Sequence, residues 1–320
     1  MLLLIQYTLV FAAVLLLVAL GGCFSEHSGV INIGLEGIMV MGALGGALVM
    51  RFMPYDLATA GFGTDFLMFI CVALASIAAG MLFSLLLAVA CINFKADQTI
   101  IGTAMNLLGT SMATVIVKAM NKAIDPDDTS SEIKYYAEKS AFTRKLFGTF
   151  EVNWFLIVAI IMLVLAYIVL YKTRFGLRLR ACGEHPQAAD SVGINVYKMR
   201  YAGVLISGLL GGLGGITYIT VGVSSWKFEV GVAGFGFLSL AVMIFGAWDP
   251  LRIAGAALLF GLFRALGNVH GSIAFLESMK IPSAVYNMLP YIVCLIVLAF
   301  TSKKSRAPKA EGIPYDKGQR

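Results

Sequence analysis

The chain has 320 residues, of which 59% are hydrophobic and 13% are charged, and its mean hydropathy is +0.86. A soluble domain carries about 25% charged residues, so this composition excludes a large soluble core and indicates a polytopic membrane protein. The net charge of +6 at pH 7 is explained by basic residues in two short segments beside the membrane, so it does not require nucleic acid as a partner.

Nine apolar runs approach the length of about 20 residues with which a helix crosses a bilayer. They are 2–21, 29–50, 66–93, 98–119, 153–171, 200–222, 234–248, 252–268 and 284–301. The sequence therefore predicts an all-α integral membrane protein with nine or ten transmembrane helices in a domain spanning 1–302. A tenth helix would require a hairpin or a broken helix within 1–93, and the glycine-rich run 29–50 is the natural place for it.

Glu36 is a carboxylate inside the second apolar run, where glycines flank it on both sides. A charge at the centre of a membrane helix costs about 2.5 kcal/mol or more, so it needs a partner, a cavity or a function. Two interpretations are open: a buried carboxyl that joins two helices, or a group in a substrate pathway or gate. Arg264, in the run 252–268, could pair with Glu36, but a position near the outer interface is preferred.

Small residues recur at helical spacing in two of the runs, as Gly42 and Gly46 and as Ser207, Gly211 and Gly215. Such faces let membrane helices approach closely, so both are predicted to be packing surfaces.

A polar stripe follows one face of the run 98–119. Its members are separated by steps of four, three, four and four residues, which places them on one side of a helix: Thr99, Thr103, Asn106, Thr110 and Thr114. The stripe predicts contact with other helices, and the alternative is a polar lining for a hydrogen-bonding solute.

Basic residues predict which segments are cytoplasmic. The segment 172–200 carries six basic and two acidic residues, and the segment after Thr301 carries the same numbers. By the positive-inside rule both are cytoplasmic, which makes 172–199 a cytoplasmic loop and 121–152 an external loop, and places the C-terminus in the cytoplasm. The tail 303–320 is basic and charged, with two prolines, and is predicted to be disordered.

A short surface helix over about 185–192 is predicted within the loop 172–199. Pro186 suits the first helical turn, Ala188 and Ala189 favour helix, and Gly193 suits the position just after the last turn. Such a helix could dock into a groove on a soluble partner, and the alternative is an ordinary connection between two spans.

Several motifs of catalysis are missing. The sequence has no Walker A pattern, no HExxH, no GxSxG and no Cys/His cluster with metal-ligand spacing. We therefore predict no catalytic residue, no metal site and no cofactor in this chain, and we do not expect it to be an enzyme.

Three segments resemble a known family. The run Gly29-Val-Ile-Asn-Ile-Gly-Leu-Glu-Gly37 is similar to the N-terminal signature of bacterial ABC permeases for nucleosides, a branch of the ribose and branched-chain amino-acid permease superfamily. Residues 176–189 resemble that family's cytoplasmic loop, with His185 where Asn is common. The stretch from Gly234 to Pro250 resembles a third family segment, with Gly246-Ala-Trp248 in place of Gly-Arg-Trp.

This resemblance implies an ABC importer permease fold and a set of partners in the cytoplasmic (inner) membrane. The partners are a homologous second permease subunit, a cytoplasmic ABC ATPase that binds ATP and Mg²⁺, and an extracytoplasmic substrate-binding protein, often a lipoprotein. The function implied is inward movement of nucleosides by alternating access. The alternatives are an ABC permease for ribose-type sugars or an autoinducer, an ion-coupled secondary transporter in which Glu36 carries the proton, and a channel.

The predictions above and the family resemblance indicate two sets of candidate site residues. Contact with the ATPase is expected at Gly183, Glu184, His185, Pro186, Ala188, Ala189 and Gly193. A route for nucleosides needs hydrogen-bonding groups of modest affinity, and the expected pathway residues are Asn32, Glu36, Thr103 and Asn106.

Overall fold

The structure, a computed structural model, describes residues 2–55, 61–133, 142–146, 150–222, 227–269, 271, 282–301 and 306–318. The helices that occupy the nine predicted runs are α1 (Leu2–His27), α2 (Leu35–Phe52), α3 (Phe62–Ala88), α4 (Gln98–Ile124), α5 (Trp154–Lys172), α8 (Val196–Thr217), α9 (Phe235–Phe245), α10 (Pro250–Val269) and α12 (Ser283–Thr301). A π-helical turn, η1 (Val89–Asn93), extends α3, and another, η3 (Tyr218–Gly222), extends α8. Each predicted run therefore contains a helix.

Seven helices of the described residues are long and apolar enough to cross a membrane. Two of the nine helices, α9 and α12, are not among these seven. The 11 residues of α9 reach about 16 Å, roughly half the hydrocarbon thickness. A tenth span would have required a hairpin or a broken helix within 1–93. The run 29–50 begins with a turn and continues as the unbroken helix α2 from Leu35 to Phe52. The short helix of the bundle lies later in the chain, at α9.

Small residues bring α2 into close contact with its neighbours. A side chain at Gly42 would overlap the backbone of Gly212 on α8, and the Cα of Gly37 lies 2.8 Å from where a Cβ of Gly109 on α4 would stand. Both glycine stripes predicted from the sequence take part, because a side chain at Gly215 would also overlap the Met39 carbonyl. The predicted packing surfaces are thus confirmed, and backbone contact of this kind excludes any larger residue.

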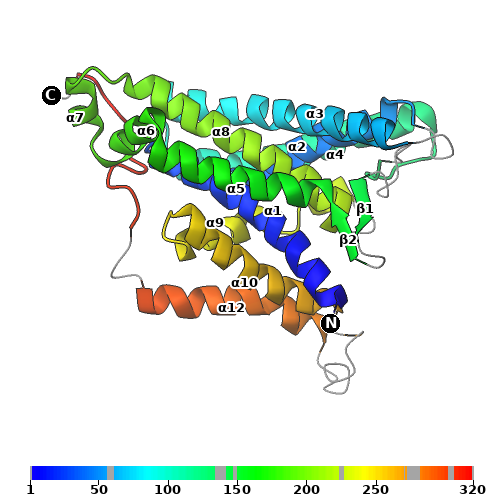
Figure 1. Ribbon diagram of the computed structural model, residues 1–320. Coiled ribbons are helices and arrows are strands. Elements are labelled where there is room, and N and C mark those ends of the chain that lie inside the picture. Colours follow the sequence, from blue (N-terminus) through cyan, green and yellow to red (C-terminus); the bar gives the residue numbers. More distant parts are fainter. Residues whose placement is uncertain are drawn as a thin grey trace.

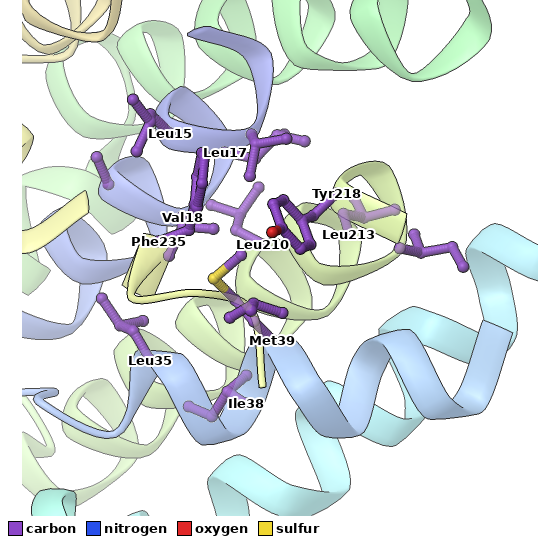
Figure 2. Packing of buried hydrophobic residues seen from close by; sticks show 14 of the residues in the cluster. Leu15, Leu17, Val18, Leu35, Ile38, Met39, Leu210, Leu213, Tyr218 and Phe235 are labelled. Atoms are coloured by element: carbon purple, nitrogen blue, oxygen red, sulfur yellow. The ribbon is translucent and has the colours of Figure 1, made fainter. Parts of the chain in front are cut away.

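The core forms where α1, α2 and α8 meet the start of α9 (Figure 2). Leu17 and Leu35 are fully buried there, and Phe235 is 1% exposed. The ring of Phe235 lies 4.8 Å from that of Tyr218 and 5.6 Å from that of Phe11. The central helices are therefore enclosed by protein, while α3, α4 and α5 keep exposed apolar faces.

The two ends of the bundle carry different elements (Figure 1). At one end lie α6 (Arg174–Glu184), α7 (Pro186–Ser191) and the C-terminus. At the other lie the N-terminus and a small hairpin, in which β1 (Thr143–Leu146) pairs antiparallel with β2 (Phe150–Asn153). The described parts of the segments predicted to be cytoplasmic thus share one end, and the hairpin, which falls in the predicted external loop, lies at the opposite end.

The C-terminal tail differs from its prediction. Residues 306–318, hereafter the C-terminal strap, pack against the end of the bundle, and Ala310 and Tyr315 are 6% and 4% exposed. Composition predicted disorder here because charged residues and prolines outnumber apolar ones. A few buried contacts supplied by other segments order the strap nevertheless.

Candidate functional site

Glu36 binds the beginning of α9. The Gly234 N–H donates to Glu36 Oε1 at 2.8 Å, and the Gly236 N–H donates to Oε2 at 2.7 Å. The first N–H groups of a helix have no partner within the helix, and its N-terminus attracts negative charge. The Glu36 carboxylate, 8% exposed, supplies both the partner and the charge. Its environment matches the interpretation of a buried carboxyl that joins two helices.

Aromatic and basic side chains surround this junction. Phe235 stands in the sequence between the two glycines that bind Glu36. The Arg264 guanidinium of α10 lies 5.2 Å from the centre of the Phe235 ring. The ring of Tyr218 also packs against that of Phe235, 4.8 Å away between centres. Arg264 therefore lies beside the Glu36 site. Thr110 also faces the junction, since its Oγ1 is 3.6 Å from where a Cβ of Gly231 would stand.

A second buried carboxylate holds the other end of α9. Trp248 Nε1 donates to Glu26 Oε2 at 2.5 Å, and Glu26 is 3% exposed. Trp248 lies in the turn that follows α9, where Ala247 and Trp248 both have positive φ. The short helix is thus fastened at its start by α2 and just beyond its end by α1. The position of α9 therefore depends on two buried carboxyl groups, Glu36 and Glu26.

Asn32 and Asn106 tie the turn before α2 to its neighbours. Asn32 Nδ2 donates to Ser207 Oγ of α8 at 2.8 Å. Asn106 Nδ2 donates to the Ile33 carbonyl, and its Oδ1 accepts from the Gly37 N–H, both at 2.9 Å. The Asn106 bonds satisfy backbone groups where the chain enters α2, and the Asn32 bond joins this turn to the side chain of Ser207. Both asparagines therefore lie close to Glu36 in the fold.

Thr103 lies apart from the other three predicted pathway residues. Its side chain is exposed on this chain and donates to carbonyls of its own helix, Thr99 and Ile100. The polar stripe of α4 is therefore divided: Thr99 and Thr103 face outward, Asn106 is buried, and Thr110 and Thr114 are half-buried.

The loop 172–199 contains two helices. Thr173 caps α6 by accepting from the Gly176 N–H at 3.1 Å, and α7 begins at Pro186 as predicted. Gly193 has φ +84, and the Ile194 N–H returns to the Ala189 carbonyl at 3.0 Å. The proline start and the glycine stop are thus confirmed, whereas α6 was not predicted.

The predicted ATPase-contact residues divide into two sets by burial. Gly183, Pro186 and Ala189 are buried and support the loop. Glu184, His185, Ala188 and Gly193 are exposed. They share this surface with Val192, an apolar side chain that is 74% exposed. Only the exposed set is available to a protein partner.

Sequence reasoning missed the two glycines that bind Glu36. A usable signal was present: Gly234 and Gly236 stand at the start of an apolar run too short to cross the membrane. A helix that begins inside the bilayer leaves N–H groups to be satisfied, and Glu36 was the candidate acceptor.

Comparison with known proteins adds independent findings. The family model described as branched-chain amino acid transport system / permease component matches residues 4–298. The guanosine ABC transporter permease protein NupQ of Bacillus subtilis (strain 168) is 41% identical, over 98% of this chain and 96% of its own length.

Two further relatives also match nearly end to end. The nucleoside ABC transporter permease protein NupC of Lactococcus lactis subsp. cremoris (strain MG1363) is 39% identical, over 97% of this chain and 96% of its own. The putative glucose ABC transporter permease protein TsgC13 of Haloferax volcanii is 30% identical, over 93% and 91%.

Proposed function

The chain belongs to the family of branched-chain amino acid transport system permease components, and from this premise we propose that it is the permease subunit of an ATP-driven importer for nucleosides. The observation that carries the proposal is the near full-length similarity to two permeases named for guanosine and nucleosides, at 41% and 39% identity. The resemblance noted in the signature 29–37 points to the same branch.

The proposed mechanism is alternating access driven from outside the chain. A cytoplasmic ATPase would contact the exposed residues of the loop 172–199, a homologous second permease would complete the route, and a binding protein would deliver the solute. The support is the small, partly apolar surface around α7, which is of the kind that docks into a groove on a partner. The solute would pass near Glu36, Asn32 and Asn106.

A sugar importer is the second candidate, because a permease named for glucose is 30% identical over most of the chain. The ion-coupled alternative is disfavoured by geometry. Both carboxylate oxygens of Glu36 accept backbone N–H groups, so a proton on Glu36 would weaken these bonds.

Transport by the reconstituted complex tests the proposal. The chain, its second permease, the ATPase and the binding protein are placed in proteoliposomes, and uptake of labelled guanosine is followed. We expect uptake to require ATP and to proceed without an ion gradient. Unlabelled nucleosides should compete, and glucose and ribose should not. Uptake driven by a proton gradient in the absence of ATP would contradict the proposal, and competition by glucose alone would favour the sugar candidate.

Orientation is a separate prediction, since 172–199 and the C-terminus are proposed to be cytoplasmic. Cysteines are introduced as Asp127→Cys and Gln187→Cys, both at exposed positions, after replacement of the five native cysteines. A membrane-impermeant maleimide should label position 127 in intact cells and position 187 only after permeabilisation. The opposite pattern would reverse the proposed topology.

A further inference from the structure

We propose that the C-terminal strap shapes the ATPase-contact surface by inserting Tyr315 into a small core beneath α7. The strap lies at the end of the bundle that carries α6 and α7 (Figure 1). The packing part of this inference concerns the chain alone. The consequence for the ATPase rests on the proposed function.

Tyr315 completes a hydrophobic cluster that is separate from the main core. The other buried members come from three consecutive helices: Cys182 of α6, Ala189 of α7 and Val196 of α8. The Tyr315 ring also meets that of Tyr197 edge-on at 5.3 Å. Because α7 has only six residues, it has little intrinsic stability, and its position depends on what Ala189 packs against.

Backbone contacts fix the path of the strap toward that cluster. The Ala310 N–H donates to the Gly183 carbonyl at 2.8 Å, at the junction between α6 and α7. Gly312 lies against Ile31, in the turn between α1 and α2, where a Cβ would meet Ile31 Cδ1 at 2.8 Å. The strap thus joins the loop 172–199 to the turn that precedes Glu36.

Contacts with charged side chains also help to position the strap along the end of the bundle. Lys95 Nζ lies 2.8 Å from Asp316 Oδ2, and this hydrogen bond holds the pKa of Asp316 below its usual value. Lys95 follows η1, so the pair links the strap to the connection between α3 and α4. The Arg200 guanidinium lies 6.0 Å from the Tyr315 ring centre. Exposed pairs contribute little energy, so Tyr315 is expected to provide most of the docking.

Cys182 is a native reporter of this packing. Burial under Tyr315 and its neighbours raises the pKa of the Cys182 thiol to about 11, and a protonated, buried thiol reacts slowly. If the strap leaves, Cys182 becomes accessible, and its rate of modification follows the population of the open form.

The experiment measures N-ethylmaleimide modification of Cys182 in inside-out vesicles that contain the whole complex, read peptide by peptide by mass spectrometry. Tyr315→Ala should raise the rate by about tenfold or more, because a large buried side chain is lost. Tyr315→Phe should react like the wild type. Ile313→Ala, at a position of the same strap that is 56% exposed, is the matched control and should also react like the wild type.

The ion pair supplies a second, milder test that does not remove a core residue. Asp316→Lys should raise the rate of Cys182 modification by about two- to threefold, and combining it with Lys95→Asp should restore the wild-type rate. Equal rates in Tyr315→Ala and wild type would overturn the proposed packing.

ATP-driven uptake by proteoliposomes that contain the same complex tests the consequence for coupling. Tyr315→Ala should lower guanosine uptake by about fivefold or more at an unchanged level of permease, and Tyr315→Phe should retain it. Exposed Cys182 with normal uptake would overturn the effect on the ATPase surface. Absence of ATP-driven uptake in the wild type would instead contradict the proposed function and leave the Cys182 result standing.

Discussion

Replacing Glu36 with alanine is expected to abolish uptake, because it removes both acceptors from the start of α9. The N–H groups of Gly234 and Gly236 would then be unsatisfied inside the membrane-spanning bundle. Each such loss costs about 1–3 kcal/mol, and the favourable contact between carboxylate and helix N-terminus is lost as well. Since α9 is only 11 residues long, we expect it to shift from its position, with failure of transport rather than of membrane insertion.

The Glu36→Gln variant distinguishes hydrogen bonding from charge. Glutamine keeps the size of the side chain and one acceptor oxygen, so it can retain one of the two bonds, and uptake should fall to an intermediate level. Uptake is measured in proteoliposomes at matched amounts of assembled complex. If Glu36→Gln and Glu36→Ala both abolish uptake in an assembled complex, the charge itself is required.

A substitution at Gly236 tests the contact between Glu36 and the start of α9 while the carboxylate stays in place. A Cβ there would come within 2.8 Å of Glu36 Oε2 and would overlap the Glu36 backbone. Gly236→Ala should therefore reproduce the loss of uptake. If the Glu36→Ala variant takes up guanosine at the wild-type rate, Glu36 has no role in the mechanism.

Replacing Ala188 with arginine is expected to separate the ATPase from the permease and to lower uptake by about tenfold or more. Ala188 is exposed on α7 beside Val192, so a long charged side chain would stand in the middle of the proposed contact. An uncompensated charge in the centre of an interface costs about 2 kcal/mol or more. Co-purification of the ATPase and ATP-dependent uptake measure the two effects.

Neighbouring substitutions provide the controls for Ala188. Ala188→Ser adds little volume and no charge, and should bind the ATPase normally. Ala189→Arg would force a charge into the cluster around Tyr315, so it should reduce the amount of folded permease instead. Normal association of the ATPase with the Ala188→Arg variant would place the contact elsewhere on the chain.

The sequence by itself determined the class of protein and the local elements. Hydropathy over consecutive residues located the nine helical runs, since the bilayer requires about 20 apolar residues for each crossing helix. Pro186 and Gly193 marked the ends of α7, because the conformational limits of proline and glycine act within one turn. The small residues at Gly42 and Gly215 likewise predicted close packing. These signals depend only on near neighbours in the chain.

The tertiary structure decided which distant residues meet. Glu36 accepts from the backbone of glycines about 200 positions later in the chain, and Glu26 accepts from the indole N–H of Trp248, 222 positions later. The α6 helix and the C-terminal strap are ordered by contacts with other segments. The composition of a short stretch of sequence holds no information about such contacts. Hydropathy shows that a residue is to be buried, and the packing of all the helices together selects its partner, because many positions in a chain of this composition could satisfy one carboxylate or one tyrosine.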